Sequence, residues 1–187
     1  LYPSVDEVDV ALKLKPSSNV QHINAYCLSP RELSAGMDRE ASTEPLTLLF
    51  VAGFRHPPNE DAALWFVKDI LPFVVSAIPG VKLMLVGSDP TAQVKALASA
   101  NVIVTGAVSS ADLESYYRKA CVAVVPLRFG AGVKLKVLEA MSERVPLVTT
   151  SIGVQGLGDA TFLQVADDAQ IFAREIVMLL QSKASRD

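Results

Sequence analysis

VAVVPLRFGAGVKLKVLEAM, residues 122–141, joins an apolar run to a helical pattern through a loop that contains two glycines. The apolar run is short and is followed by a proline, which is typical of a strand buried on both faces of a sheet. The helical pattern opens with Lys134 and carries Glu139. The segment therefore predicts a strand over residues 121–127, then a loop, and a helix over residues 132–142.

Four more apolar runs repeat this alternation along the chain. The first, LTLLFVAG, ends in Gly53, and Asn59 then stands in position to cap a helix. Pro72 is expected to kink that helix or to end its first half. Ser110 is placed to cap a later helix. Five strands that alternate with helices through short connections predict an α/β fold with a doubly wound, Rossmann-like parallel sheet. The other strands are expected over residues 46–53, 81–87, 101–106 and 145–150, and the other helices over residues 58–80, 91–99, 110–119 and 168–181.

Residues 1–45 are less regular than the rest of the chain. Val8–Leu14 is compatible with a short helix or a strand, Val20–Leu28 has the length of a strand, and Pro30–Pro45 has the composition of a linker. The chain begins at a leucine, without an initiator methionine or a signal peptide, and we expect it to be a piece of a longer protein.

Composition excludes several classes of protein. Half of the 187 residues are hydrophobic and the net charge is −3, which disfavours a general nucleic-acid-binding or anionic-membrane surface. No apolar run reaches the ~18 residues of a spanning helix. Cys27 and Cys121 match no metal spacing, and Cys121 opens an apolar strand, so we expect a reducing, cytoplasmic compartment. His22 and His56 have no partner at metal-ligand spacing, and no metal is expected.

The loop over residues 128–134 has the chemistry of a phosphate-binding site. Gly130 and Gly132 allow backbone N–H groups to approach a phosphate closely, and the N-terminus of the following helix adds a partial positive charge. Arg128 and Lys134 supply two fixed cations that can neutralise a diphosphate. The segment therefore predicts a nucleotide-diphosphate site.

Glu139 has two possible roles. It lies seven residues beyond Gly132, about 10 Å along the helix axis, which is a suitable reach from a diphosphate to the ribose of the same nucleotide. The alternative is a surface ion pair with Lys136, three residues earlier on the same helix. The sequence favours the ribose role without excluding the ion pair.

Other candidate residues follow the remaining strands. In doubly wound sheets, ligands bind at the carboxyl ends of the strands, so these residues are expected to converge on one site. A nicotinamide dinucleotide is disfavoured because the loop GFRHPPN lacks the spaced glycines of G-x-G-x-x-G. We expect Arg128 and Lys134 to be catalytic, and we expect donor contacts from Gly53, Arg55, Gly87, Gly106, Val108, Phe129, Gly130, Ala131, Gly132, Val133, Leu135 and Glu139.

Five blocks of the sequence, taken in order, resemble one known family. They are LFVAGFRHPPNEDAALWF, LMLVGSDP, VIVTGAVS, VAVVPLRFGAGVKLKVLEAM and VPLVTTSIGVQGL. On these blocks, residues 46 to about 181 resemble the C-terminal, donor-binding domain of GT-B-fold retaining glycosyltransferases, the glycosyl transferases group 1 family.

The resemblance implies a hexosyltransferase-like enzyme of polysaccharide or glycoconjugate biosynthesis. Its donor would be a sugar nucleotide, transferred with retention at the anomeric carbon and without metal or cofactor. Residues 46–187 would be the nucleotide-sugar-binding domain, and residues 1–45 the end of an N-terminal domain with the interdomain connection. That other domain would hold a carbohydrate, lipid or protein acceptor, and the full-length protein would associate peripherally with a membrane. Arg128 and Lys134 would stabilise the charge on the departing diphosphate.

Two positions depart from the family pattern. Many members carry two glutamates eight residues apart; Glu139 matches the second, but Ala131 stands at the first, so backbone amides around Phe129–Gly132 would have to contact the sugar. After the first strand, Arg55 is present, but Asn59 stands near the place of a family lysine. Two alternatives stay open: a non-catalytic nucleotide-binding module, and a GT-B-type epimerase or phosphorylase.

Overall fold

The computed structural model describes residues 5–17, 20 and 46–182. Its centre is a six-stranded sheet in the order β3-β2-β1-β4-β5-β6, in which every neighbouring pair is parallel. The chain runs outward from β1 to β3, returns to the centre at β4, and then runs outward on the other side, as in a doubly wound sheet. The strands are β1 (Thr47–Val51), β2 (Lys82–Val86), β3 (Val102–Gly106), β4 (Val122–Val125), β5 (Leu147–Thr149) and β6 (Gln164–Val165).

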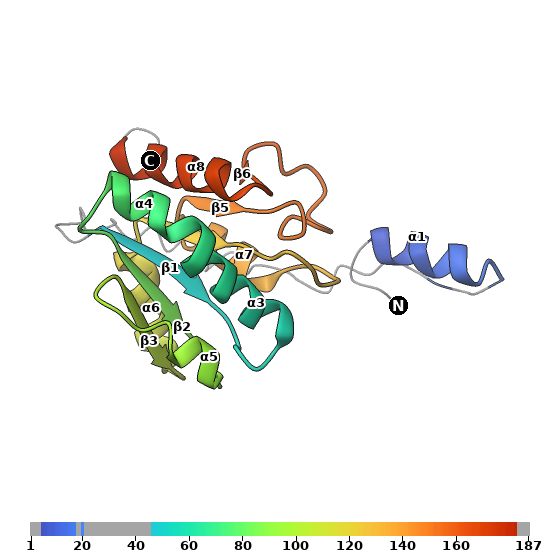
Figure 1. Cartoon of the computed structure of the whole chain (residues 1–187). Coiled ribbons are helices and arrows are strands. Elements are labelled where there is room, and N and C mark those ends of the chain that lie inside the picture. Colours follow the sequence, from blue (N-terminus) through green and yellow to red (C-terminus); the bar gives the residue numbers. More distant parts are fainter. Residues whose placement is uncertain (1–4, 18–19, 21–45, 183–187) are drawn as a thin grey trace.

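Helices cover both faces of this sheet (Figure 1). On one face α3 and α4 lie beside α8, and on the other face lie α6 and α7. The helices are α1 (Val5–Leu14), α3 (Pro57–Trp65), the π-helical turn η1 (Phe66–Ile70), α4 (Leu71–Ala77), α5 (Ala92–Lys95), α6 (Ser110–Lys119), α7 (Leu135–Ser142) and α8 (Ala169–Gln181).

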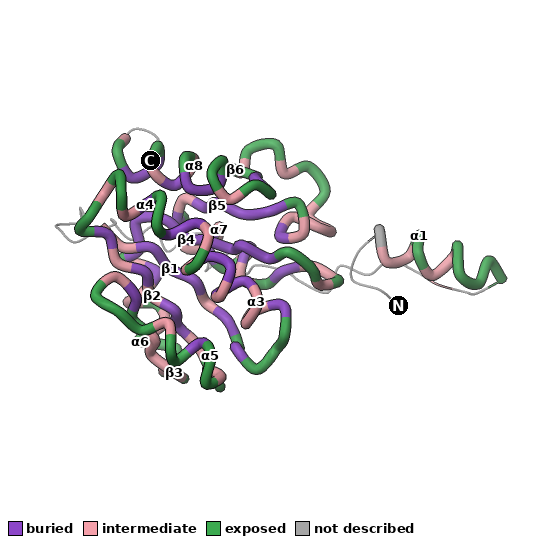
Figure 2. The backbone as a smooth tube through the Cα atoms, viewed as in Figure 1, coloured by how far each residue is buried: buried purple, intermediate pink, exposed green. Residues whose placement is uncertain are grey.

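The core lies on both faces of the central strands (Figure 2). All four residues of β4 are buried, because β1 and β5 flank the strand and helices cover it on either side. Phe172 of α8 packs edge-on against Trp65 and Phe66, with ring centroids 6.2 and 6.1 Å apart. This aromatic contact fixes α8 against α3 and η1.

The predicted strands and long helices are confirmed, and two predicted helix caps are wrong. The first helix begins at Pro57, because proline fits a first turn whose N–H groups have no partner in the helix. Its N-cap is His56, and Asn59 lies inside the first turn with its side chain directed elsewhere. Ser109, not Ser110, caps α6, where its hydroxyl accepts a backbone N–H of the first turn at 3.2 Å.

The predicted effect of Pro72 appears as an interruption of the helix: the π-helical turn η1 ends at Ile70, and α4 begins at Leu71 with Pro72 in its first turn. There the amide of Leu71 donates to the carbonyl of Phe66, five residues back. Three elements differ from prediction: α5 has only four residues of the nine expected, α7 begins at Leu135 and not at residue 132, and β6 was not predicted at all. Strand β6 is two exposed residues long, so it carries no apolar run that would reveal it.

The N-terminal predictions are tested only in part. Residues 8–14 belong to the helix α1, which decides between the two expectations for that segment. The predicted strand Val20–Leu28 lies outside the described residues except for Val20, and so does the predicted linker Pro30–Pro45. Within the described ranges, no helix combines the length and apolar character needed to cross a membrane.

Candidate functional site

The sheet reverses its winding between β1 and β4. These strands are neighbours, yet the chain leaves β1 toward β2 on one side and leaves β4 toward β5 on the other. The loops that follow them, residues 52–56 and 126–134, therefore lie at the carboxyl edge of the sheet where its winding reverses. Open α/β sheets bind their ligands at such a switch point.

The loop of residues 126–134 is held in place from β5. The hydroxyl of Thr149 donates to the Val125 carbonyl at 3.0 Å, and the hydroxyl of Thr150 donates to the Leu127 carbonyl at 2.5 Å. Both threonines are fully buried. Gly130 and Gly132 take the positive φ angles of 126° and 78°, which side-chain-bearing residues rarely adopt. The loop is thus a preformed structure and not a loose connection.

Lys134 lies inside this loop. The residue is only 8% exposed, and its Nζ donates to the carbonyls of Gly130, at 3.4 Å, and of Gly132. Burial lowers the pKa of the Lys134 ammonium, while the carboxylate of Glu7 acts in the opposite direction. Lys134 therefore supplies a positive charge from within the loop and also fixes the loop's shape.

Arg128 is paired across the switch point. Its guanidinium forms a two-point ion pair with Asp61 of α3, with Nε 2.9 Å from Oδ2, and lies 5.4 Å from the ring centroid of Trp65. The ion pair raises the pKa of Arg128. A guanidinium has five N–H donors, and Asp61 accepts two of them. The remaining donors stay available for a ligand, but the carboxylate offsets much of the charge that Arg128 was predicted to contribute.

Lys136 makes a second contact across the switch point, which sequence reasoning missed. Its Nζ donates to Oδ1 of Asn59 at 2.5 Å and lies 5.2 Å from the ring centroid of Phe50 in β1. The side-chain amide of Asn59 in turn donates to the carbonyl of Gly53 at 2.8 Å. Lys136 thus joins α7 to the first turn of α3 and to the loop after β1.

Glu139 makes a contact that the sequence did not predict. Among the described residues, no direct ion pair joins Glu139 to Lys136, although the carboxylate is close enough to raise the pKa of the lysine. Instead, the hydroxyl of Tyr117 in α6 donates to Oε2 of Glu139 at 3.1 Å. Burial and this carboxylate raise the pKa of Tyr117, which keeps its hydroxyl protonated. Glu139 is exposed and is oriented by Tyr117, and its ribose role stays a prediction.

The other predicted contacts lie around the same edge. Gly53 and Arg55 are exposed in the loop after β1, and Phe129 and Leu135 are 45% and 47% exposed beside the β4 loop. Gly87 has a structural role, because a Cβ there would lie 1.8 Å from the Ala52 carbonyl oxygen. Ala131 is exposed, whereas the following contacts are partly exposed: Gly106, Val108, Gly130, Gly132 and Val133.

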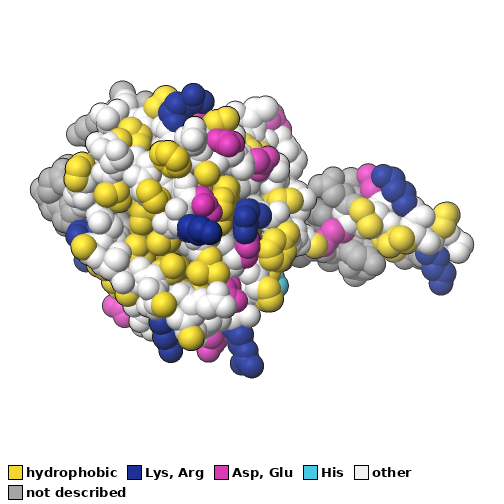
Figure 3. Space-filling model, viewed as in Figure 1, with side chains coloured by type: hydrophobic (Ala, Val, Ile, Leu, Met, Phe, Trp, Pro, Cys, Tyr) yellow, Lys and Arg dark blue, Asp and Glu magenta, His cyan; other side chains and the backbone are white. Residues whose placement is uncertain are grey.

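The described residues form neither a metal-binding cluster nor, on the face seen in Figure 3, an extended basic surface. No group of three or more His, Cys, Asp or Glu side chains among them is arranged to hold a metal ion. On the face drawn in Figure 3, Lys and Arg side chains are interspersed with Asp and Glu, so no extended basic field forms there.

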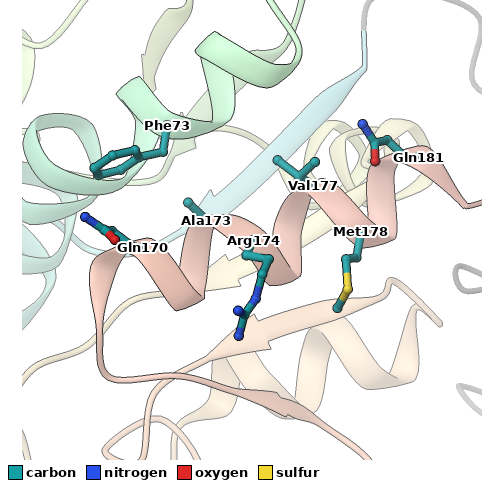
Figure 4. Close-up of a pocket in the computed structure, with 7 residues that line it drawn as sticks. All are labelled: Phe73, Gln170, Ala173, Arg174, Val177, Met178 and Gln181. Atoms are coloured by element: carbon teal, nitrogen blue, oxygen red, sulfur yellow. The ribbon is translucent and has the colours of Figure 1, made fainter.

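The structure also contains a groove away from the switch point. It lies between α4 and α8, has a volume of about 400 Å³, and is lined by Phe73, Ala173, Val177 and Met178 with polar side chains at its rim (Figure 4). None of the predicted site residues lines it, so it is separate from the candidate site.

Residues 45–182 match the family model described as glycosyl transferases group 1. The chain belongs to this family. A curated relative, an uncharacterized 44.6 kDa protein in the cps region of Klebsiella pneumoniae, is 32% identical over 139 residues; the match covers 70% of this chain and 36% of the relative. Family membership and the expected resemblance are thereby confirmed.

Solved structures share the fold of this group 1 chain. A TarM variant from S. aureus, in complex with fondaparinux, alpha-GlcNAc-glycerol and UDP, superposes with a TM-score of 0.68 at 15% identity. The pneumococcal O-GlcNAc transferase GtfA, in complex with UDP and GlcNAc, gives 0.68 at 18% identity. A putative UDP-N-acetylglucosamine 2-epimerase from Listeria monocytogenes gives 0.54 at 16% identity.

These superpositions cover most of the group 1 chain but a smaller part of its neighbours. They include 96%, 98% and 76% of this chain, and 36%, 39% and 38% of the TarM, GtfA and epimerase chains. The predicted fold class, a doubly wound α/β sheet of the GT-B type, is confirmed. The chain spans well under half the length of the relatives it matches.

Proposed function

We propose that this chain is the nucleotide-sugar-binding half of a glycosyltransferase, with a nucleoside diphosphate sugar bound at the β1/β4 switch point. The observation that carries the proposal is the β4–α7 loop, in which two glycines with positive φ surround the buried Lys134. Backbone N–H groups and a fixed cation next to a helix start are the usual means of binding phosphate. Family membership supports a transferase over other nucleotide-binding proteins.

The proposed reaction is a retaining, metal-independent transfer. As the bond between the sugar and the diphosphate breaks, negative charge grows on the departing phosphate. Donors that are already in place stabilise that charge more than they stabilise the bound donor. Lys134 is the main contributor in this proposal, because Arg128 shares its charge with Asp61. In the whole protein, residues 1–45 belong to the end of the acceptor-binding domain and its connection.

The relatives suggest a biological setting for the proposal. The curated relative is named for its place in a cps region, and two structural neighbours were solved with UDP and with glycans or sugars. From these relatives we infer that the full-length protein acts in polysaccharide or glycoconjugate synthesis, with a carbohydrate, lipid or protein as its acceptor. The epimerase-like neighbour favours a second candidate, a GT-B-type epimerase. Assays of the full-length protein separate the two, because a transferase links sugar to an acceptor and an epimerase does not.

Nucleoside diphosphate binding is expected to raise the melting temperature of this chain and to persist in EDTA. A ligand that binds only the folded state stabilises it by about 2.7 kcal/mol at a hundredfold excess over Kd. The measurement is a thermal-shift panel of UDP, GDP, ADP and dTDP, each with and without EDTA. A panel without any shift would contradict the proposed site, and a shift abolished by EDTA would contradict metal independence.

Glu139→Gln is expected to keep the fold and to weaken nucleotide binding through the ribose. Tyr117 donates to one carboxylate oxygen, and an amide would replace the second acceptor by a donor. Removal of the ligand's 2′-hydroxyl should therefore cost the wild type more than the variant, with a coupling of about 0.5–3 kcal/mol. Calorimetric titration with ribo- and deoxyribonucleotides measures this coupling.

The matched control for this comparison of ribo- and deoxyribonucleotides is Glu143→Gln. This substitution changes a carboxylate just after the same helix. It should bind both ligands as the wild type does. If Glu139→Gln behaves in the same way, the ribose assignment is wrong and Arg128 and Lys134 are left as the argued contacts.

A further inference from the structure

Lys136 is a cation at the switch point that takes part in no ion pair with another described residue. By contrast, Arg128, in the loop after β4, is paired with Asp61 of α3. Its hydrogen-bond acceptor is the neutral amide oxygen of Asn59, and its other neighbour is the ring of Phe50. A hydrogen bond and a ring face offset only part of the cost of removing an ammonium ion from water.

The charges around Lys136 also do not offset the cost of burying its ammonium group. Burial lowers its pKa to about 8; Glu139 acts in the opposite direction, and Lys134 adds to the lowering. The carboxylates of α3 are engaged elsewhere, since Glu60 accepts the hydroxyl of Thr91 and Asp61 holds Arg128. Among the described residues, Glu139 is therefore the one carboxylate that acts on Lys136, and it does not offset the lowering of the pKa by burial.

We propose that Lys136 is a further anion-binding residue of this site, whose ammonium leaves Asn59 to meet a phosphate of the nucleoside diphosphate. The inference rests on the proposed function and assigns a role to a residue that sequence reasoning did not place in the site. Asn59 holds the Lys136 side chain beside the loop after β1. Rotation of the lysine stem would bring the ammonium to the ligand.

Binding of a diphosphate next to Lys136 would change the protonation of this lysine. Close to pH 8, a substantial share of Lys136 is neutral in the free protein. A phosphate beside the amine favours the charged form, and its pKa then returns toward the usual value near 10.5. Binding of the diphosphate therefore takes up a proton from solution between about pH 8 and pH 10, whereas binding of the nucleoside does not.

The test is calorimetric titration at pH 8.5 with UDP, GDP, ADP and dTDP and with their four nucleosides. Each titration is run in two buffers of different ionisation enthalpy, because the difference in heat counts the protons taken up. Lys136→Met should weaken diphosphate binding about tenfold or more, leave nucleoside binding unchanged and abolish proton uptake. Lys119→Met removes a charge from an exposed lysine at the end of α6 and should change none of these quantities.

Lys136→Arg keeps the inference testable if the methionine variant is poorly folded. A guanidinium stays charged at every pH used, so this variant should bind the diphosphate without taking up a proton. Proton uptake in Lys136→Arg as large as in the wild type, or equal losses for diphosphate and nucleoside in Lys136→Met, would overturn the role of Lys136. A small remaining uptake belongs to Lys134, whose pKa burial also lowers. If the wild type binds a diphosphate and Lys136→Met binds it equally well, only this inference fails. If none of the four diphosphates binds the wild type, the proposed function fails with it.

Discussion

Gly87→Ala is expected to be the most damaging single-methyl substitution at the carboxyl edge. Gly87 has a φ of +147°, and a Cβ would lie 1.8 Å from the carbonyl oxygen and 2.7 Å from the carbonyl carbon of Ala52. Both contacts are to backbone of the adjoining strand, so relief requires the ends of β1 and β2 to separate. That movement would strain the hydrogen bond from Ala52 N to Val86 O, which is 2.9 Å long. We expect a loss of about 3 kcal/mol or more in the free energy of unfolding.

Gly53→Ala is the matched control for this substitution. Gly53 follows the neighbouring strand, its φ is not positive, and an added Cβ would meet only the Ser88 hydroxyl at an ordinary 3.5 Å. Urea unfolding followed by circular dichroism should show a small change for Gly53→Ala and a large one for Gly87→Ala. Equal stabilities of the two variants would contradict the close approach of β1 and β2.

Lys134→Ala is expected to weaken diphosphate binding far more than nucleoside binding. The ammonium donates to the carbonyls of Gly130 and Gly132 and brings positive charge to the proposed phosphate position. A charge-assisted hydrogen bond to phosphate contributes about 1.5–3 kcal/mol, so the diphosphate should bind roughly ten- to a hundredfold more weakly. Calorimetric titration with the diphosphate that binds most tightly, and with its nucleoside, measures both losses.

Lys134→Met separates charge from packing in this experiment. It retains most of the buried stem of the lysine and removes the ammonium. Similar diphosphate affinities of the alanine and methionine variants would assign the effect to charge. Equal losses for diphosphate and nucleoside would show that Lys134 acts through the stability of the loop instead.

Most of the fold was predictable because the central strands are continuous apolar runs. β1, β2 and β4 lie between helices on both faces, so nearly every position along them is hydrophobic. Strand β6 has only two residues, Gln164 and Val165, both exposed, and forms because it pairs with β5. Helix ends were less predictable, because Asn59 is a good capping residue that is used for a tertiary contact instead.

The place of the site was also predictable, but its internal contacts were not. Glycines and cations at a strand end point to the carboxyl edge from sequence alone. Arg128 and Asp61 are 67 residues apart, and Lys136 and Asn59 are 77 residues apart, so neither pair follows from local spacing. Local spacing places Lys136 next to Glu139 on its own helix, where an i, i+3 pair is the expectation, and gives no sign of its contact with Asn59.

The central claim is that a nucleoside diphosphate binds at the β1/β4 switch point of this chain. The most direct test is an NMR titration of the ¹⁵N-labelled chain with UDP, GDP, ADP and dTDP, with backbone amide shifts followed residue by residue. We predict that at least one of the four shifts the amides of Gly53, Gly130 and Gly132, while those of Ala173 and Val177 in the α4/α8 groove stay in place. Shifts confined to that groove, or no shifts with any of the four, would contradict the account.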